Sequence, residues 1–154
     1  MVALQDLGFF ARHIFDHRGA TSAQELAIAS DWVSWPELVS TFTRVTGRRA
    51  EFVPLDADAW CDLAVDADVP LAAEGAAGDT TWRENMRWWW KLYRDDLIQR
   101  DFGWLRSVHP GLLTLEKWMR TTGYTGEFKG ALTKSREDGA RGFSAFVEER
   151  VNKL

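Results

Sequence analysis

The stretch 81–105 constrains the fold most, because it holds five of the nine tryptophans in the chain. On a helix, its large apolar side chains recur at steps of about 3.6 residues and form one continuous stripe. This stripe consists of Trp82, Met86, Trp89, Trp90, Tyr93 and Leu97. Thr81 followed three residues later by Glu84 matches a capping box, which predicts that the helix begins here. Since each aromatic ring can bury ~150–250 Å², we expect this helix to contribute more burial than any other segment.

Three consecutive tryptophans in this stretch do not fit a simple core helix. Trp88, Trp89 and Trp90 project roughly 100° apart, so all three cannot face one core. Either the helix is buried on two sides, or at least one indole faces a partner chain or a ligand. We therefore name Trp88, Trp89, Trp90 and Tyr93, together with Phe10, as candidate residues for binding a flat, apolar substrate. The alternative is that they belong to the core, the usual role of a stripe at helical spacing.

The remaining segments predict an α+β fold that is mostly helical. We expect helices at 6–17 with Asp6 as N-cap, at 34–47, at 57–63, from 114 to 123 and near the C-terminus. The tryptophan-rich helix is expected to break near 100–103 and to resume briefly around 104–105. Short runs at 25–29 and 50–53 predict two strands. The total is five or six helices with a small two-stranded sheet, in a single domain over 1–154. We expect a long loop at 65–79 and an irregular segment at 124–142.

Composition and motifs exclude several classes of protein. The net charge of −4 does not indicate the basic surface that a nucleic-acid-binding protein needs. No apolar run approaches ~18 residues, and no signal peptide is apparent, so we predict a cytoplasmic protein with no membrane span. The single cysteine, Cys61, is interpreted as a small core residue. There is no glycine-rich dinucleotide fingerprint, P-loop or zinc-ligand spacing, so we expect no cofactor and no metal.

Histidine is the side chain best suited to acid–base chemistry near neutral pH, and the chain has three. His13, Asp16 and His17 share one helix face at i, i+3 and i+4, so the carboxylate could orient an imidazole. We name these three residues as the catalytic candidates. The alternative is a solvated helix end, with His17 favoured by the helix dipole. His109 precedes Pro110, and we interpret it as part of a structural turn.

Three blocks of the sequence resemble the C-terminal half of fungal NmrA-like proteins, which are atypical relatives of short-chain dehydrogenases. The blocks are DLGFFARHIFDHR (6–18), ELAIASDWVSWPELVSTFTRVTGRRAEFVPL (25–55) and DFGWLRSVHPGLLTLEKWMR (101–120). Members of that family begin with a Rossmann domain that carries the nucleotide loop, and this chain starts where that domain would be over. The resemblance therefore implies the fold and the pocket location of the substrate half, and it does not imply NAD(P) binding.

These expectations lead to one functional hypothesis and two alternatives. The leading hypothesis is a cofactor-independent enzyme of fungal secondary metabolism. It would be an isomerase, cyclase, dehydratase or decarboxylase acting on an apolar polyketide- or terpenoid-like intermediate. The alternatives are a non-catalytic NmrA-like interaction or regulatory module, and a truncated fragment that needs a Rossmann partner. Because the family's substrate half normally packs on its Rossmann half, we expect a homodimer to bury the apolar surface left exposed.

Overall fold

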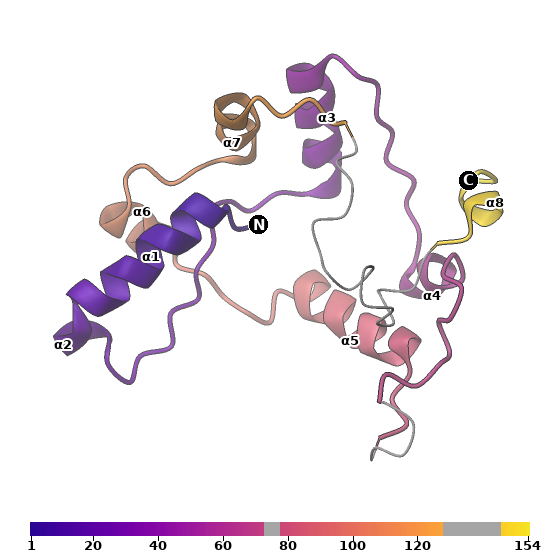
Figure 1. The fold of residues 1–154 in the computed structure, drawn as a ribbon, viewed down its shortest axis with the longest axis horizontal. Coiled ribbons are helices and arrows are strands. Elements are labelled where there is room, and N and C mark those ends of the chain that lie inside the picture. Colours follow the sequence, from indigo (N-terminus) through magenta and orange to yellow (C-terminus); the bar gives the residue numbers. More distant parts are fainter. Residues whose placement is uncertain (73–77, 128–145) are drawn as a thin grey trace, which may run out of the picture. The chain divides into compact units, whose positions relative to one another are not determined.

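The computed structural model describes residues 1–72, 78–127 and 146–154, and about half of them are helical (Figure 1). The helices are α1 (Leu4–Asp16), α2 (Arg18–Thr21), α3 (Trp35–Thr46), α4 (Ala57–Cys61), α5 (Trp82–Arg94), α6 (Phe102–Val108), α7 (Leu115–Thr122) and α8 (Glu148–Val151). The chain divides into two compact units, which are described separately. Unit 1 comprises Met1–Phe52 and Ile98–Phe128, and unit 2 comprises Val53–Leu97 and Lys129–Leu154.

The predicted two-stranded sheet is wrong, since the described part of the chain contains no strand. In the run 25–29, Ile28 and Ala29 instead pack on the core of unit 1 without a ladder partner. The run 50–53 leaves Phe52 and Val53 exposed. Favourable side chains do not make a strand unless a second strand satisfies the backbone groups. The fold is therefore helical, and its isolated bridges join Ala64 to Phe146 and Pro70 to Thr81.

The predicted start and stop signals of the other helices are largely confirmed. The side chains of Ser34, Asp56, Thr81 and Thr114 cap the helices that follow them, and Thr81 with Glu84 forms the full capping box. Gly47 and Gly123 end α3 and α7 in the left-handed conformation, with φ of 72° and 62°. That conformation is open to glycine at little cost, which explains why these two helices stop where they do.

The predicted N-cap of the first helix is wrong. α1 begins at Leu4 behind Ala3, which makes no side-chain cap. Asp6 lies inside the first turn and is 1% exposed, because its carboxylate turns inward to accept hydrogen bonds from elsewhere in unit 1. The predicted end of α4 at Leu63 is also wrong, since the helix stops at Cys61.

Each unit has its own small hydrophobic core. In unit 1 the core cluster consists of Phe10, Ala29, Leu105 and Leu112, and α6 supplies Phe102, Trp104 and Val108 around it. In unit 2 it consists of Cys61, Ala64, Ala67 and Trp82, with Trp60 and Met86 packed against it. Cys61 is a free, fully buried thiol, as predicted, and burial raises its pKa.

Within unit 1, α3 packs against α7, and an ion pair joins the two helices. Arg44 on α3 lies 2.7 Å from the carboxylate of Glu116 on α7, which also accepts from Arg120. Hydrogen bonds from Arg44 and Arg120 lower the pKa of Glu116 to about 2. The pair is solvated, so we regard it as orienting α3 and α7 more than stabilising them.

Two predicted irregular segments lie partly outside the described residues. Of the expected loop 65–79, residues 65–72 and 78–79 are non-helical, while 73–77 are not described. Of the expected segment 124–142, residues 124–127 are non-helical and the remainder is not described. No helix in the described part of the chain is both long and apolar enough to cross a membrane.

Candidate functional site

The three residues predicted to be catalytic all lie in unit 1, at the C-terminal end of α1. The rings of His13 and His17 stack with centroids 4.2 Å apart, and the His17 Nδ1 lies 3.0 Å from the His13 carbonyl oxygen. Asp16, which was expected to orient an imidazole, forms an ion pair with Arg12 at 3.1 Å. The structure thus brings the two imidazoles together and gives the carboxylate an arginine as its partner.

A second carboxylate–imidazole pair, which sequence reasoning missed, lies inside unit 1. The Nε2 of His109 is 2.9 Å from Oδ1 of Asp6, and the backbone N–H of Leu113 donates to Oδ2 at 3.1 Å. The His109 ring also stacks on Phe9, with centroids 3.9 Å apart. Since a carboxylate oxygen accepts, Nε2–H is the donor, and the neutral ring has its free lone pair on Nδ1. One signal in the sequence indicated that Asp6 is buried: it precedes the apolar residue Phe10 by four positions and so shares its inward face.

Phe10, a predicted substrate-binding residue, is fully buried in the core of unit 1. Its ring lies 5.9 Å from Trp104 and meets His109 edge-on at 6.0 Å. Phe9 and Phe10 therefore lie beside the His109 ring, and Trp104 packs on Phe10. This arrangement can hold an imidazole in one tautomer and orientation in a largely apolar setting.

The aromatic candidates from the tryptophan-rich helix lie in unit 2, on α5. Trp90 is half-buried and meets Trp60 edge-on at 5.5 Å, while Trp60 stacks on Trp82 at 5.3 Å. Trp88, Trp89 and Tyr93 point outward and are 67%, 44% and 48% exposed. We call these last three side chains the α5 aromatic surface. The predicted single stripe is therefore only partly right: Trp82 and Trp90 face the core, while Trp89, Tyr93 and Leu97 are exposed, and Leu97 lies beyond the end of α5.

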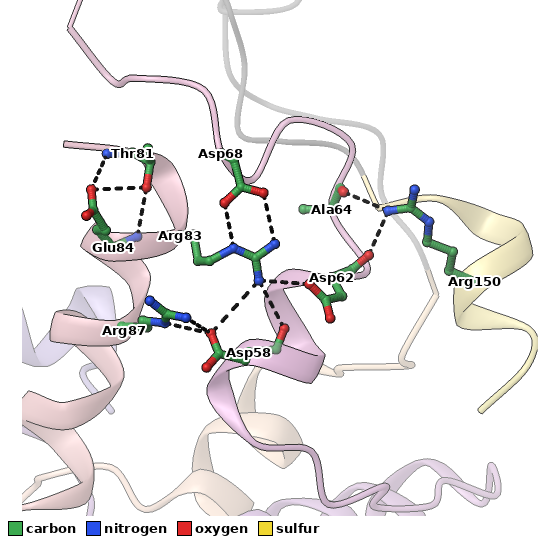
Figure 2. Close-up of polar contacts among 9 residues, drawn as sticks. All are labelled: Asp58, Asp62, Ala64, Asp68, Thr81, Arg83, Glu84, Arg87 and Arg150. Carbon is green, nitrogen blue, oxygen red and sulfur yellow. Dashed lines mark hydrogen bonds and ion pairs between the residues drawn. The ribbon is translucent and has the colours of Figure 1, made fainter. Parts of the chain in front are cut away.

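Unit 2 also contains a network of arginine and aspartate side chains that joins α5 to the segment 58–68 (Figure 2). Arg83 donates to both carboxylate oxygens of Asp68, at 2.7 and 3.1 Å, and its Nη1 lies 2.8 Å from Asp62. Arg87 on the next turn binds Asp58. Hydrogen bonds to Asp68 and Asp62 raise the pKa of Arg83 and lower that of Asp68. We call these five residues the Arg83 network.

A cavity of about 630 Å³ lies beside the Arg83 network. Its lining is made by Asp62, Ala64, Val65, Asp66, Ala67, Asp68, Val69, Arg83 and Arg150. Arg150 donates to the backbone oxygens of Asp62 and Ala64 at 2.7 and 3.1 Å (Figure 2). The lining is charged and contains none of the aromatic or histidine candidates, so this cavity does not match the apolar substrate expected from the sequence.

Among the described residues, no group of three or more histidine, cysteine, aspartate or glutamate side chains is placed to hold a metal ion. The predicted site residues fall into two sets, with Phe10, His13, Asp16 and His17 in unit 1 and Trp88, Trp89, Trp90 and Tyr93 in unit 2. The chain matches no protein-family model, no curated protein and no solved structure. The resemblance to NmrA-like proteins therefore stays a prediction.

Replacing Asp6 with alanine is expected to destabilise unit 1. The substitution leaves the Leu113 N–H and the His109 ring without their acceptor in a buried place, which costs about 1–3 kcal/mol. Asp16→Ala is the matched control, because its exposed ion pair contributes about 0–1 kcal/mol. Urea unfolding followed by circular dichroism measures both free energies of unfolding. Equal losses for the two variants would contradict the structural role assigned to Asp6.

Replacing Arg83 with alanine is expected to loosen the segment 67–71 from the start of α5. This segment is held there by backbone hydrogen bonds between Trp82 and Val69, at 3.2 Å, and between Leu71 and Thr80, at 2.9 Å. Losing charge-assisted bonds worth about 1.5–3 kcal/mol should speed hydrogen exchange at these amides by about tenfold or more. The control is Arg94→Ala, which removes only a pair with the adjacent Asp95. Unchanged exchange in the Arg83 variant would show that the network does not hold this segment.

Proposed function

We propose that the chain is a non-catalytic interaction module that binds a polypeptide through the α5 aromatic surface. The observation that carries this proposal is the exposure of Trp88, at 67%, on the same helix as the exposed Trp89 and Tyr93, whose rings lie 4.7 Å apart. Exposed aromatic side chains that gather on one helix mark interaction surfaces more often than isolated apolar residues do. Tryptophan and tyrosine are also the residue types that most often dominate binding energy in protein interfaces.

The placement of the aromatic residues supports binding of a partner over enclosure of a substrate. A substrate pocket buries most of its ligand in a concave, mostly apolar cavity. Trp88, Trp89 and Tyr93 instead lie on the outside of α5, and the charged cavity of unit 2 does not include them. Exposed aromatic side chains on the outside of a helix fit a polypeptide surface better than a small apolar molecule.

The occupant that best fits the side of α5 that carries Trp88 is a second copy of the chain. Glu84, Trp88 and Lys91 are all exposed and share one helix face at i, i+4 and i+7, with the Lys91 ammonium 5.0 Å from the Trp88 ring. This row has an acid at one end, an indole in the middle and a base at the other end. Two antiparallel copies of α5 would therefore place Glu84 of one copy opposite Lys91 of the other, as a two-fold interface requires.

Truncating Trp88 tests this proposal. Trp88→Ala is expected to raise the dimer Kd by roughly thirtyfold, because a central aromatic residue typically contributes about 2 kcal/mol. The matched control is Trp32→Ala, since Trp32 is 70% exposed and lies in unit 1. Sedimentation velocity over a micromolar concentration series measures both constants. Lys91→Glu should also weaken the dimer, and by more than Lys91→Gln, because it sets two acidic side chains against each other.

The sedimentation results distinguish the possible binding partners of the α5 aromatic surface. A wild-type chain that sediments as a monomer at every concentration would rule out the second copy, and a Rossmann-type partner would then become the occupant to test. A dimer that is weakened equally by Trp32→Ala and Trp88→Ala would place the interface elsewhere. A dimer weakened by Trp88→Ala alone is the result we expect.

A second candidate function is the cofactor-independent isomerase, cyclase, dehydratase or decarboxylase acting on an apolar polyketide- or terpenoid-like intermediate. The observation that favours it is the Asp6–His109 pair, with an imidazole 18% exposed and a carboxylate 1% exposed. Such a carboxylate fixes the histidine tautomer and stabilises the imidazolium that forms when the ring accepts a proton. In this hypothesis His109 Nδ1 is the proton-transfer atom, and Asp6 is its positioning residue.

Turnover of a panel of aromatic polyketides and cyclic terpenoids, followed by mass spectrometry and chromatography, tests this second candidate. If the wild-type chain converts any of them, His109→Gln is expected to lower the rate by about 10²–10⁴-fold, the usual contribution of acid–base catalysis. If His13→Ala, Asp16→Ala or His17→Ala abolishes turnover instead, the predicted α1 residues are the catalytic ones. The absence of any conversion would count against the enzyme hypothesis.

A further inference from the structure

The sequence contains one pair of adjacent arginines, Arg48 and Arg49, just after the end of α3. Every other lysine or arginine of the chain has neither a lysine nor an arginine next to it. Both arginines are exposed, and the side chain of Arg49, at 89%, forms an ion pair with the equally solvated Glu51 at 3.3 Å. An exposed ion pair holds its partners only weakly. Both guanidinium groups are therefore accessible to another protein.

The backbone around this pair is also accessible. Residues 47–56 contain no helix or strand, and most of them are exposed. Within the described part of the chain, the backbone groups of residues 49–55 take part in no hydrogen bond with other backbone groups. A peptide that binds as an added strand needs its backbone N–H and C=O groups free. Exposed irregular segments are accordingly the sites at which proteases cut folded proteins most readily.

The other basic side chains of the described residues are less suitable as protease sites. Most of them lie on helices, Arg100 is half-buried, and Lys153 is followed by a single residue. Arg48 and Arg49 combine exposure with a pattern that a protease can read, since each planar guanidinium fits a carboxylate through two parallel hydrogen bonds.

We propose that the peptide bond between Arg49 and Ala50 is a processing site for a serine endoprotease that recognises paired basic residues. Two neighbouring acidic subsites of the protease take the two guanidinium groups. Water adds across the peptide bond, so that Arg49 acquires a carboxylate and Ala50 a free amino group. The site belongs to unit 1 and does not depend on the α5 aromatic surface, which lies in unit 2.

Cleavage at this bond leaves unit 1 assembled from two fragments. The helices α1 to α3 precede the cut, and α6 and α7 follow it. The fragments stay joined by the bond between Asp6 and His109, at 2.9 Å, and by the pair of Arg44 with Glu116, at 2.7 Å. Because folding of the cleaved protein requires two chains to associate, its unfolding temperature becomes dependent on concentration.

Incubation of the full chain with a subtilisin-like endoprotease specific for paired basic residues tests the proposal, with mass spectrometry to identify the fragments. We expect one early cut, giving 1–49 and 50–154, which co-elute from a size-exclusion column in buffer and separate in urea. Arg49→Gln should slow cleavage by at least about a hundredfold and Arg48→Gln by about tenfold or more, because a subsite built for a charged group is left unpaired. Glu51→Gln keeps both arginines and should change the rate by less than about threefold.

Ala11→Arg is the matched control, because it places an arginine beside Arg12 on an exposed part of α1. The bond after Arg12 should stay intact while the bond after Arg49 is cut, since a helix must open before a protease can bind it. Circular dichroism establishes that each variant keeps its helices. Equal cleavage at the two positions, or a first cut elsewhere, would overturn the proposal. An intact wild-type chain under conditions that digest a peptide of residues 44–55 would overturn it too.

Discussion

Unit 1 depends on a single buried carboxylate, that of Asp6. It is almost fully removed from water, and a charge in that position is tolerated only when it is paired and hydrogen-bonded. His109 and the backbone of Leu113 provide those bonds from more than a hundred residues further along the chain. Because the hydrophobic core contains only a few residues, this polar contact fixes where α1 sits against the turn between α6 and α7. Asp31 adds a similar bond to the first residue of α7, through the N–H of Leu115.

In unit 2 the largely buried charge is a cation, and its partners are carboxylates. Arg83 is the largely buried ion, at 16% exposed, and three aspartates of the segment 58–68 surround it. The three carboxylates are exposed to solvent and pair with the guanidinium, which stays charged. The aliphatic part of the Arg83 side chain packs inward. In the same unit, Trp82 belongs to the core cluster and Trp60 stacks on it at 5.3 Å. In both units, therefore, a few polar contacts between residues far apart in the sequence fix how the segments of that unit pack. The small apolar clusters could not determine this packing alone.

Local features of the fold could be predicted from the sequence, and long-range ones could not. The caps at Ser34, Asp56, Thr81 and Thr114 were predictable because capping depends on residues three positions apart. The sheet was predicted wrongly because apolar runs at 25–29 and 50–53 say nothing about whether a pairing strand exists. The Asp6–His109 contact was missed because each residue has an ordinary local role, as an N-cap or a turn residue. The consecutive tryptophans left open whether α5 is buried on two sides or exposes an indole, and the identity of any occupant is not a local property.

The stacked tryptophans give unit 2 a distinct optical signature. Trp60 lies 5.3 Å from Trp82 and 5.5 Å from Trp90, so the excited states of the three indoles are coupled. Coupled indoles produce a strong circular dichroism band whose sign and size depend on their mutual orientation. The cluster lies wholly within unit 2, and the band would vanish as soon as that unit loosens, whatever happens to α1. The chain thus carries a built-in spectroscopic label that distinguishes the melting of one unit from the melting of the other.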